Sequence, residues 1–146
     1  MSNDNIKIKH WAVIVTGLLA FALSLIWYSP LLFGKIWKAL RSSSVSSTPE
    51  WTMIFAPLRE IIAAYILAYL IVRLSLKDWK SAVRLSFMLW VAFYVVSLAG
   101  AVLWDNMPWQ LGAVHAGDWF MKMMFMALVL SYWHSKNRSK SNVIVG

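Results

Sequence analysis

The sequence contains no cysteine and only six acidic residues among its 146 positions. Without thiols there can be no disulfide framework, cysteine-ligated zinc, iron–sulfur cluster or CxxC redox centre, which excludes the membrane thiol oxidoreductases. Charged residues make up only 14% of the chain, whereas hydrophobic residues make up 60% and ten tryptophans are present. A soluble domain of this size does not combine so little charge with so much apolar surface. The composition therefore predicts a membrane protein.

The sequence also lacks the short motifs of soluble enzymes, namely a P-loop, GxGxxG, GxSxG and HExxH. His10 and His134 could form a metal site only with a third ligand, which the sequence does not supply. We therefore expect no enzymatic activity, no cofactor and no metal.

The net charge of +8 does not point to nucleic acid, because the basic residues lie at the edges of apolar segments. We expect no nucleic-acid partner. The expected partners of the basic residues are the anionic headgroups of membrane lipids.

Four apolar segments are long enough to cross the ~30 Å core of a bilayer at ~1.5 Å per residue. They cover approximately residues 10–29, 54–74, 85–104 and 113–133. Between the first two, the polar run of residues 41–48 predicts an exposed loop, and residues 134–146 predict a mobile basic tail. The predicted fold class is an all-α integral membrane protein, a bundle of four transmembrane helices in a single domain over residues 1–146.

The first segment also resembles a secretory signal, with Lys7 and Lys9 before a short apolar run and Ala20-Phe21-Ala22 as a cleavage site. However, apolar sequence continues through Phe33, beyond that site. A transmembrane helix is therefore the preferred interpretation.

The distribution of basic residues predicts the orientation. Four crossings put both termini on one side, with nine Lys and Arg residues there against four on the other. The nine are Lys7, Lys9, Arg73, Lys77, Lys80, Arg84, Lys136, Arg138 and Lys140, and the four are Lys35, Lys38, Arg41 and Arg59. Both termini are therefore expected in the cytoplasm. The four opposing residues argue less strongly against this if Lys35 and Lys38 lie on an interfacial helix.

The first helix closes on the run WYSPLLFGKIWK, residues 27–38. This run resembles the signature of domain-of-unknown-function family 1761, a family of small bacterial four-helix membrane proteins. AAYILAYLIV in the second helix, LWVAF in the third and a fourth helix closing on Trp133 agree in character and order. The signature residues are Trp27, Tyr28, Ser29, Pro30, Phe33, Gly34, Lys35 and Trp37. The resemblance implies the four-helix fold and a bacterial cytoplasmic membrane, but no reaction.

The fourth helix departs from the family's apolar character through His115, Asp118 and Lys122, which recur at i, i+3 and i+7 and share one helical face. They could form a proton or ion relay, or the polar end of a cavity. Alternatively, the helix begins at Asp118 as N-cap and Lys122 extends its ammonium to the interface. The sequence favours the second interpretation.

Glu60 shares a helical face with Ala56, Ala64 and Ala68, at spacings of four residues that let helices approach closely. It could be a coupling carboxylate on a packing face. The sequence favours an interfacial glutamate that is solvated or paired with Arg59.

The first helix carries its own stripe of small residues. Ala12, Thr16, Ala20 and Ser24 recur every fourth position, which predicts a face that packs against a neighbouring helix or a second subunit.

These observations favour a non-catalytic structural or accessory membrane component. The alternative is a small transporter or channel subunit for a small solute or ion, with a polar site at the fourth helix. Four short helices can enclose a pathway only as a homo-oligomer.

Overall fold

The computed structural model of the chain describes residues 8–41, 51, 54–76 and 78–144. Of the loop predicted at residues 41–48, Arg41 is instead the last residue of a helix, and residues 42–48 lie outside the described residues. The main elements are α1 (His10–Trp27), α2 (Gly34–Arg41), α3 (Phe55–Arg73), α4 (Trp79–Leu89), the π-helical segment η2 (Trp90–Val95), α5 (Val96–Trp104) and α6 (Trp109–Ile144). The described residues contain helices and no strand. Four helical stretches are long and apolar enough to cross a membrane: His10–Trp27, Phe55–Arg73, Trp79–Trp104 and Trp109–Ser135. The all-α fold class with four candidate spans is confirmed.

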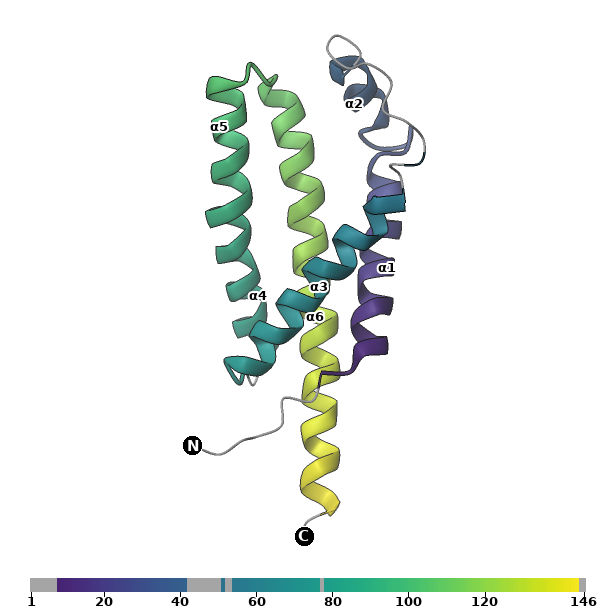
Figure 1. Cartoon of the computed structure of the whole chain (residues 1–146), viewed down its shortest axis with the longest axis vertical. Coiled ribbons are helices and arrows are strands. Elements are labelled where there is room, and N and C mark those ends of the chain that lie inside the picture. The colour runs from purple at the N-terminus through teal and green to yellow at the C-terminus, as the bar shows by residue number, and fades with distance from the viewer. Residues whose placement is uncertain (1–7, 42–50, 52–53, 77, 145–146) are drawn as a thin grey trace.

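The four spans are arranged around α6. In Figure 1, α4 and α5 form one long helix on one side of α6, α1 lies on the other side, and α3 crosses diagonally. The start of α1 and the C-terminal end of α6 lie toward the same end of the bundle, whereas α2 and the turn between α5 and α6 lie toward the other. Four successive crossings produce this arrangement.

The third span begins six residues earlier than predicted, at Trp79 instead of residue 85. Asp78 caps this helix by accepting hydrogen bonds from the Ser81 backbone N–H at 2.9 Å and from its hydroxyl at 2.7 Å. Lys80 and Arg84, predicted to lie in a connection, are therefore helical and exposed. Their long apolar stems allow the charged heads to reach water from a helix end.

The fourth span also differs from its predicted bounds of 113–133. It begins at Trp109, where the amides of Leu111 and Gly112 donate to the Pro108 carbonyl at 2.9 and 3.1 Å. It continues as helix to Ile144, so residues 134–144 of the predicted basic tail are helical. The first two spans agree with prediction to within two residues at each end.

Small residues form the contact between α1, α3 and α6. All four members of the α1 stripe are buried, as are Ala64 and Ala68 of α3. A Cβ added at Gly17 would lie only 2.7 Å from the Ile61 Cα, so the α1 and α3 backbones approach closely there. The Thr16 hydroxyl is satisfied within its own helix by donating to the Ala12 carbonyl at 2.7 Å. The predicted small-residue faces are therefore packing faces in this structure.

Beyond Ala82 and Ser86, which are buried in α4, the third span packs on α6 through larger groups. Trp90 donates its indole N–H to the Ala116 carbonyl at 3.0 Å, and its ring lies 5.1 Å from that of Phe120. Tyr94 packs on Trp119 with 5.1 Å between ring centroids. The aromatic residues at the middle of this span are therefore used in intramolecular packing.

Candidate functional site

Three charged side chains from two helices meet in the interior of the bundle. The Lys122 ammonium of α6 lies 2.7 Å from Oδ2 of Asp118, one turn before it, and 2.8 Å from Oε1 of Glu60 on α3. Glu60 and Lys122 are 0% exposed and Asp118 is 1% exposed. We call these three residues the ion cluster. Two carboxylates face one ammonium, so the cluster carries a formal charge of −1.

Lys122 is the central residue of the span Trp109–Ser135. At ~1.5 Å per residue it lies about 20 Å from either end of that span, farther than a lysine side chain can reach. The interpretation favoured by the sequence, in which Asp118 caps the helix and Lys122 extends to the interface, is therefore wrong. Its premise fails because α6 begins nine residues before Asp118, at Trp109.

Asp118 is satisfied from two sides. Its Oδ1 accepts a hydrogen bond of 2.7 Å from the Ser24 hydroxyl of α1, and its Oδ2 pairs with Lys122. Ser24 belongs to the small-residue stripe, so one residue serves both close packing and the ion cluster. Helices α1, α3 and α6 are thus all joined to this cluster.

Glu60 is buried and not solvated, contrary to the interpretation that the sequence favours. Its predicted pairing with Arg59 is present, with Arg59 Nη2 at 2.9 Å from the same Oε1 that accepts from Lys122. The other oxygen, Oε2, is buried and has no hydrogen-bond partner among the described residues. A buried acceptor without a partner is unusual and costs free energy.

Trp119 is in contact with both cations. The Lys122 ammonium is 4.4 Å and the Arg59 guanidinium carbon 5.1 Å from the Trp119 ring, within the range of cation–π attraction. The Arg59 side chain is 58% exposed, so it marks where the ion cluster approaches the surface.

His115, the third member of the predicted α6 face, is not joined directly to the ion cluster. Its Nδ1 shares a 2.7 Å hydrogen bond with the Tyr28 hydroxyl at the end of α1. The neighbouring Trp27 donates its indole N–H to the Val114 carbonyl at 3.1 Å. The Trp27 ring also packs directly on Gly117, because a Cβ added at Gly117 would lie 2.7 Å from that ring. The end of α1 is therefore fastened to α6 just before Asp118.

The signature run forms the turn between α1 and α2. The Phe33 amide donates to the Trp27 carbonyl at 3.1 Å, and their rings pack 4.4 Å apart. Gly34 is required by close approach, because an added Cβ would lie 2.3 Å from the Tyr28 carbonyl oxygen. The Tyr28 ring packs on Trp37 with 5.4 Å between centroids.

The remaining signature residues have different environments. Pro30 and Lys35 are exposed, whereas the Ser29 hydroxyl oxygen is buried with no hydrogen-bond partner among the described residues. The signature therefore positions α2 and the end of α1 and contributes no charged group to the ion cluster.

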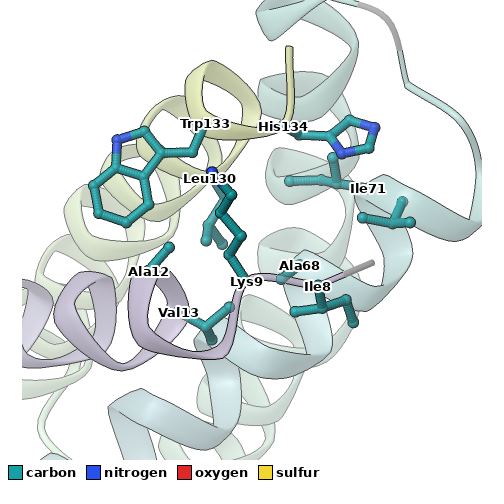
Figure 2. Close-up of a pocket in the computed structure, with 10 residues that line it drawn as sticks. Ile8, Lys9, Ala12, Val13, Ala68, Ile71, Leu130, Trp133 and His134 are labelled. Atoms are coloured by element: carbon teal, nitrogen blue, oxygen red, sulfur yellow. The ribbon is translucent and has the colours of Figure 1, made fainter. Parts of the chain in front are cut away.

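A small cavity of about 30 Å³ lies at the other end of α1. Figure 2 shows Lys9 extending from the start of α1 toward α6, next to Val13, Leu130 and Trp133. Because Ser24 is eleven residues further along α1 than Val13, about 16 Å at ~1.5 Å per residue, this cavity is separate from the ion cluster. Within the described residues, no group of three or more His, Asp or Glu side chains could hold a metal ion.

The sequence placed Asp118 and Lys122 on one helical face and offered Arg59 as a partner of Glu60, but it did not predict that Glu60 joins the two α6 residues. It also gave no chemical role to Ser24 or Trp119. Trp119 directly follows Asp118 in the sequence, and this adjacency was the signal that could have identified it.

Comparison with known proteins gives a family and no activity. A family model described as "Protein of unknown function (DUF1761)" matches residues 11–131, which include all four spans except the ends of the first and last. No curated protein and no solved structure matches the chain.

Proposed function

The chain belongs to the DUF1761 family, and because that family has no assigned activity, we propose a function from the site itself: a non-catalytic multi-pass membrane protein that handles a small cation or solute at the ion cluster. This is the transporter or channel alternative that the sequence ranks second.

The observation that carries the proposal is the burial of Lys122 between Asp118 and Glu60 at the centre of a span. Charged groups inside a membrane are costly, and they typically mark ion pathways, proton relays or substrate sites. A helix bundle that served only as a scaffold could use apolar residues of similar volume, which often stabilise a protein as well as a buried ion pair does. The cost of this cluster therefore favours a functional role.

We further propose that the protein works as a homo-oligomer. A pathway past the ion cluster needs walls on every side, and four short helices can enclose one only together with further copies of the chain. The third span has the surface for an additional contact, because Phe93, Leu103 and Trp104 are each more than 70% exposed.

The same surface supports the structural or accessory alternative. Only 6% of the apolar part of the third span is buried within the chain, against 28–33% for the other three spans. A partner membrane protein that covers α4 and α5 would use the chain as a docking subunit. Oligomeric state separates the alternatives: the transport proposal expects a homo-oligomer, and a monomer that gains stability only with a partner favours the accessory role.

For localisation we propose a bacterial cytoplasmic membrane with both termini in the cytoplasm and the basic terminal side against anionic lipids. The excess of nine basic residues over four supports this orientation. On the opposite side, Lys35 and Lys38 lie on the amphipathic α2, as expected for an interfacial helix. Reporter fusions after Gly146 and within residues 42–47 should read cytoplasmic and external respectively. The reverse pattern overturns the orientation.

The transport proposal is tested in proteoliposomes of the full chain on a solid-supported membrane. We expect jumps of H⁺, Na⁺, K⁺, methylammonium or guanidinium concentration to produce a charge displacement with at least one of these cations. The displacement should be lost in Glu60→Gln, whereas Lys35→Gln, an exposed change on α2, should retain it. A folded chain that gives no displacement above protein-free liposomes with all five cations overturns the proposal.

A further inference from the structure

Arg59 contacts both a buried carboxylate and an aromatic ring at the outer edge of the site. Its guanidinium combines a charged contact to Glu60 with a position over the Trp119 ring, although the side chain is more than half exposed. A carboxylate beside an aromatic face is the combination that attracts guanidinium and alkylammonium groups. The residues around Arg59 thus form a cation-binding surface that the chain's own side chain covers.

The fit of Arg59 to this surface is incomplete. Consecutive residues of a helix do not face each other, so Arg59 must reach around α3 to contact Glu60. It makes a single contact at Oε1, which it shares with Lys122. Oε2 stays buried without a partner in the described part of the chain, although a carboxylate and a guanidinium can form two parallel hydrogen bonds. A planar cation free of the backbone could use both oxygens.

The charges favour exchange of one cation for another. The ion cluster has a formal charge of −1, and the Arg59 guanidinium brings it to zero. If Arg59 turns outward to water or lipid headgroups, another monovalent cation can restore neutrality. Its exposed, flexible side chain permits that movement with no change in the helices.

We propose that Glu60 and Trp119 form a binding site for guanidinium and short alkylguanidinium ions. In the structure, the guanidinium group of Arg59 occupies the position that such a small planar cation would take. This inference rests on the proposed function, because it names the class of cation that the ion cluster would handle. The tethered guanidinium keeps the site closed until a free cation displaces it.

The experiment measures equilibrium binding of radiolabelled guanidinium to the purified full chain in detergent, at constant ionic strength set with NaCl. Arg59→Ala opens the site, so we expect saturable binding at one site per chain, with methylguanidinium as competitor and Na⁺ without effect. The wild-type chain should bind at least about tenfold more weakly, because its own guanidinium competes. Arg73→Ala, at the exposed far end of α3, should match the wild type.

Two double variants test the named groups. Arg59→Ala/Glu60→Gln should abolish the binding, and Arg59→Ala/Trp119→Phe should weaken it. The second keeps the test decisive if the first does not fold, since a phenyl face attracts cations less than an indole face. A folded Arg59→Ala chain without saturable binding overturns the inference, as does binding that Trp119→Phe leaves unchanged.

The outcome is separable from that of the transport proposal. Binding of guanidinium to Arg59→Ala without any charge displacement in proteoliposomes supports the site and overturns transport. Charge displacement by Na⁺ or H⁺ without guanidinium binding supports transport and overturns the assignment of the cation.

Discussion

Two regions of the bundle achieve their packing by different means. Where α1, α3 and α6 meet, small residues such as Ala20, Ala64 and Ala127 are 0% exposed and the backbones come close together. From residue 90 to residue 104 of the third span, aromatic side chains pack on α6, and no residue of η2 or α5 is buried. The first region is tight and polar at its centre, whereas this second region is open and charge-free.

The contrast shows why the charges lie where they do. Short ion contacts inside a membrane need side chains from several helices within about 3 Å, and small residues provide that approach. Ser24 and Glu60 lie on the two small-residue faces, and both join the α6 charges directly. Close packing and charge pairing therefore depend on each other in one region and are both absent from the other.

The largest effect is expected from Lys122→Met. Removing the ammonium leaves two carboxylates buried close together, and breaking a buried ion pair costs about 3–5 kcal/mol. We expect a large fall in the thermal unfolding temperature of the chain in detergent or lipid nanodiscs. Asp118→Asn alone should also destabilise it, because Lys122 then keeps only Glu60.

The double change Asp118→Asn/Lys122→Met sharpens this result. It removes one charge of each sign and leaves Glu60 paired with Arg59, so the loss should be smaller than the sum of the two single losses. Strictly additive losses would show that Asp118 and Lys122 do not interact, in conflict with their 2.7 Å contact.

A second test inserts bulk into the tight region. Ala20→Leu or Ala64→Leu adds three carbons at a position that is 0% exposed and should cost about 1–3 kcal/mol or more by overpacking. Ala22→Leu, two residues from Ala20 on an exposed part of α1, is the matched control and should change thermal stability little. Equal losses at Ala20 and Ala22 would mean that the stripe is not an interface.

The sequence predicted the helices well because each span must satisfy its own backbone hydrogen bonds in lipid, and this requirement shows locally as a long apolar run. The stripe from Ala12 to Ser24 was predictable for the same reason, since its spacing lies within one helix. The pairing of Glu60 with Lys122 was not, because the two residues are 62 positions apart and no local pattern relates them. The early start of α6 was missed because the polar residues His115 and Asp118 obscured an apolar run that begins at Trp109.

A smaller effect on thermal stability is expected when one glycine from each region is replaced by alanine. At Gly17 an added Cβ would lie 2.7 Å from the Ile61 Cα, so Gly17→Ala must move α1 from α3 and should cost about 1–3 kcal/mol. At Gly100 the nearest atom would be the Trp104 ring at 3.2 Å, and this ring is 78% exposed and can move. Gly100→Ala should therefore be close to neutral. A reversed order in thermal unfolding would contradict the division into tight and open regions.

The smallest effect concerns the start of the open span. Hydrogen bonds from the Ser81 side chain and backbone, with the nearby Lys80 charge, hold the pKa of the exposed Asp78 carboxyl below its usual value. Because the folded-state pKa is the lower one, the cap contributes stability above the unfolded pKa of about 4 and loses it as the pH falls through the folded value. Between pH 6 and pH 3, hydrogen-exchange protection of the first turn of α4 should therefore decrease. Asp78→Asn retains a good capping side chain that does not titrate, so its protection should change less over the same range. An equal decrease in both chains would mean that another group controls the acid response of this helix end.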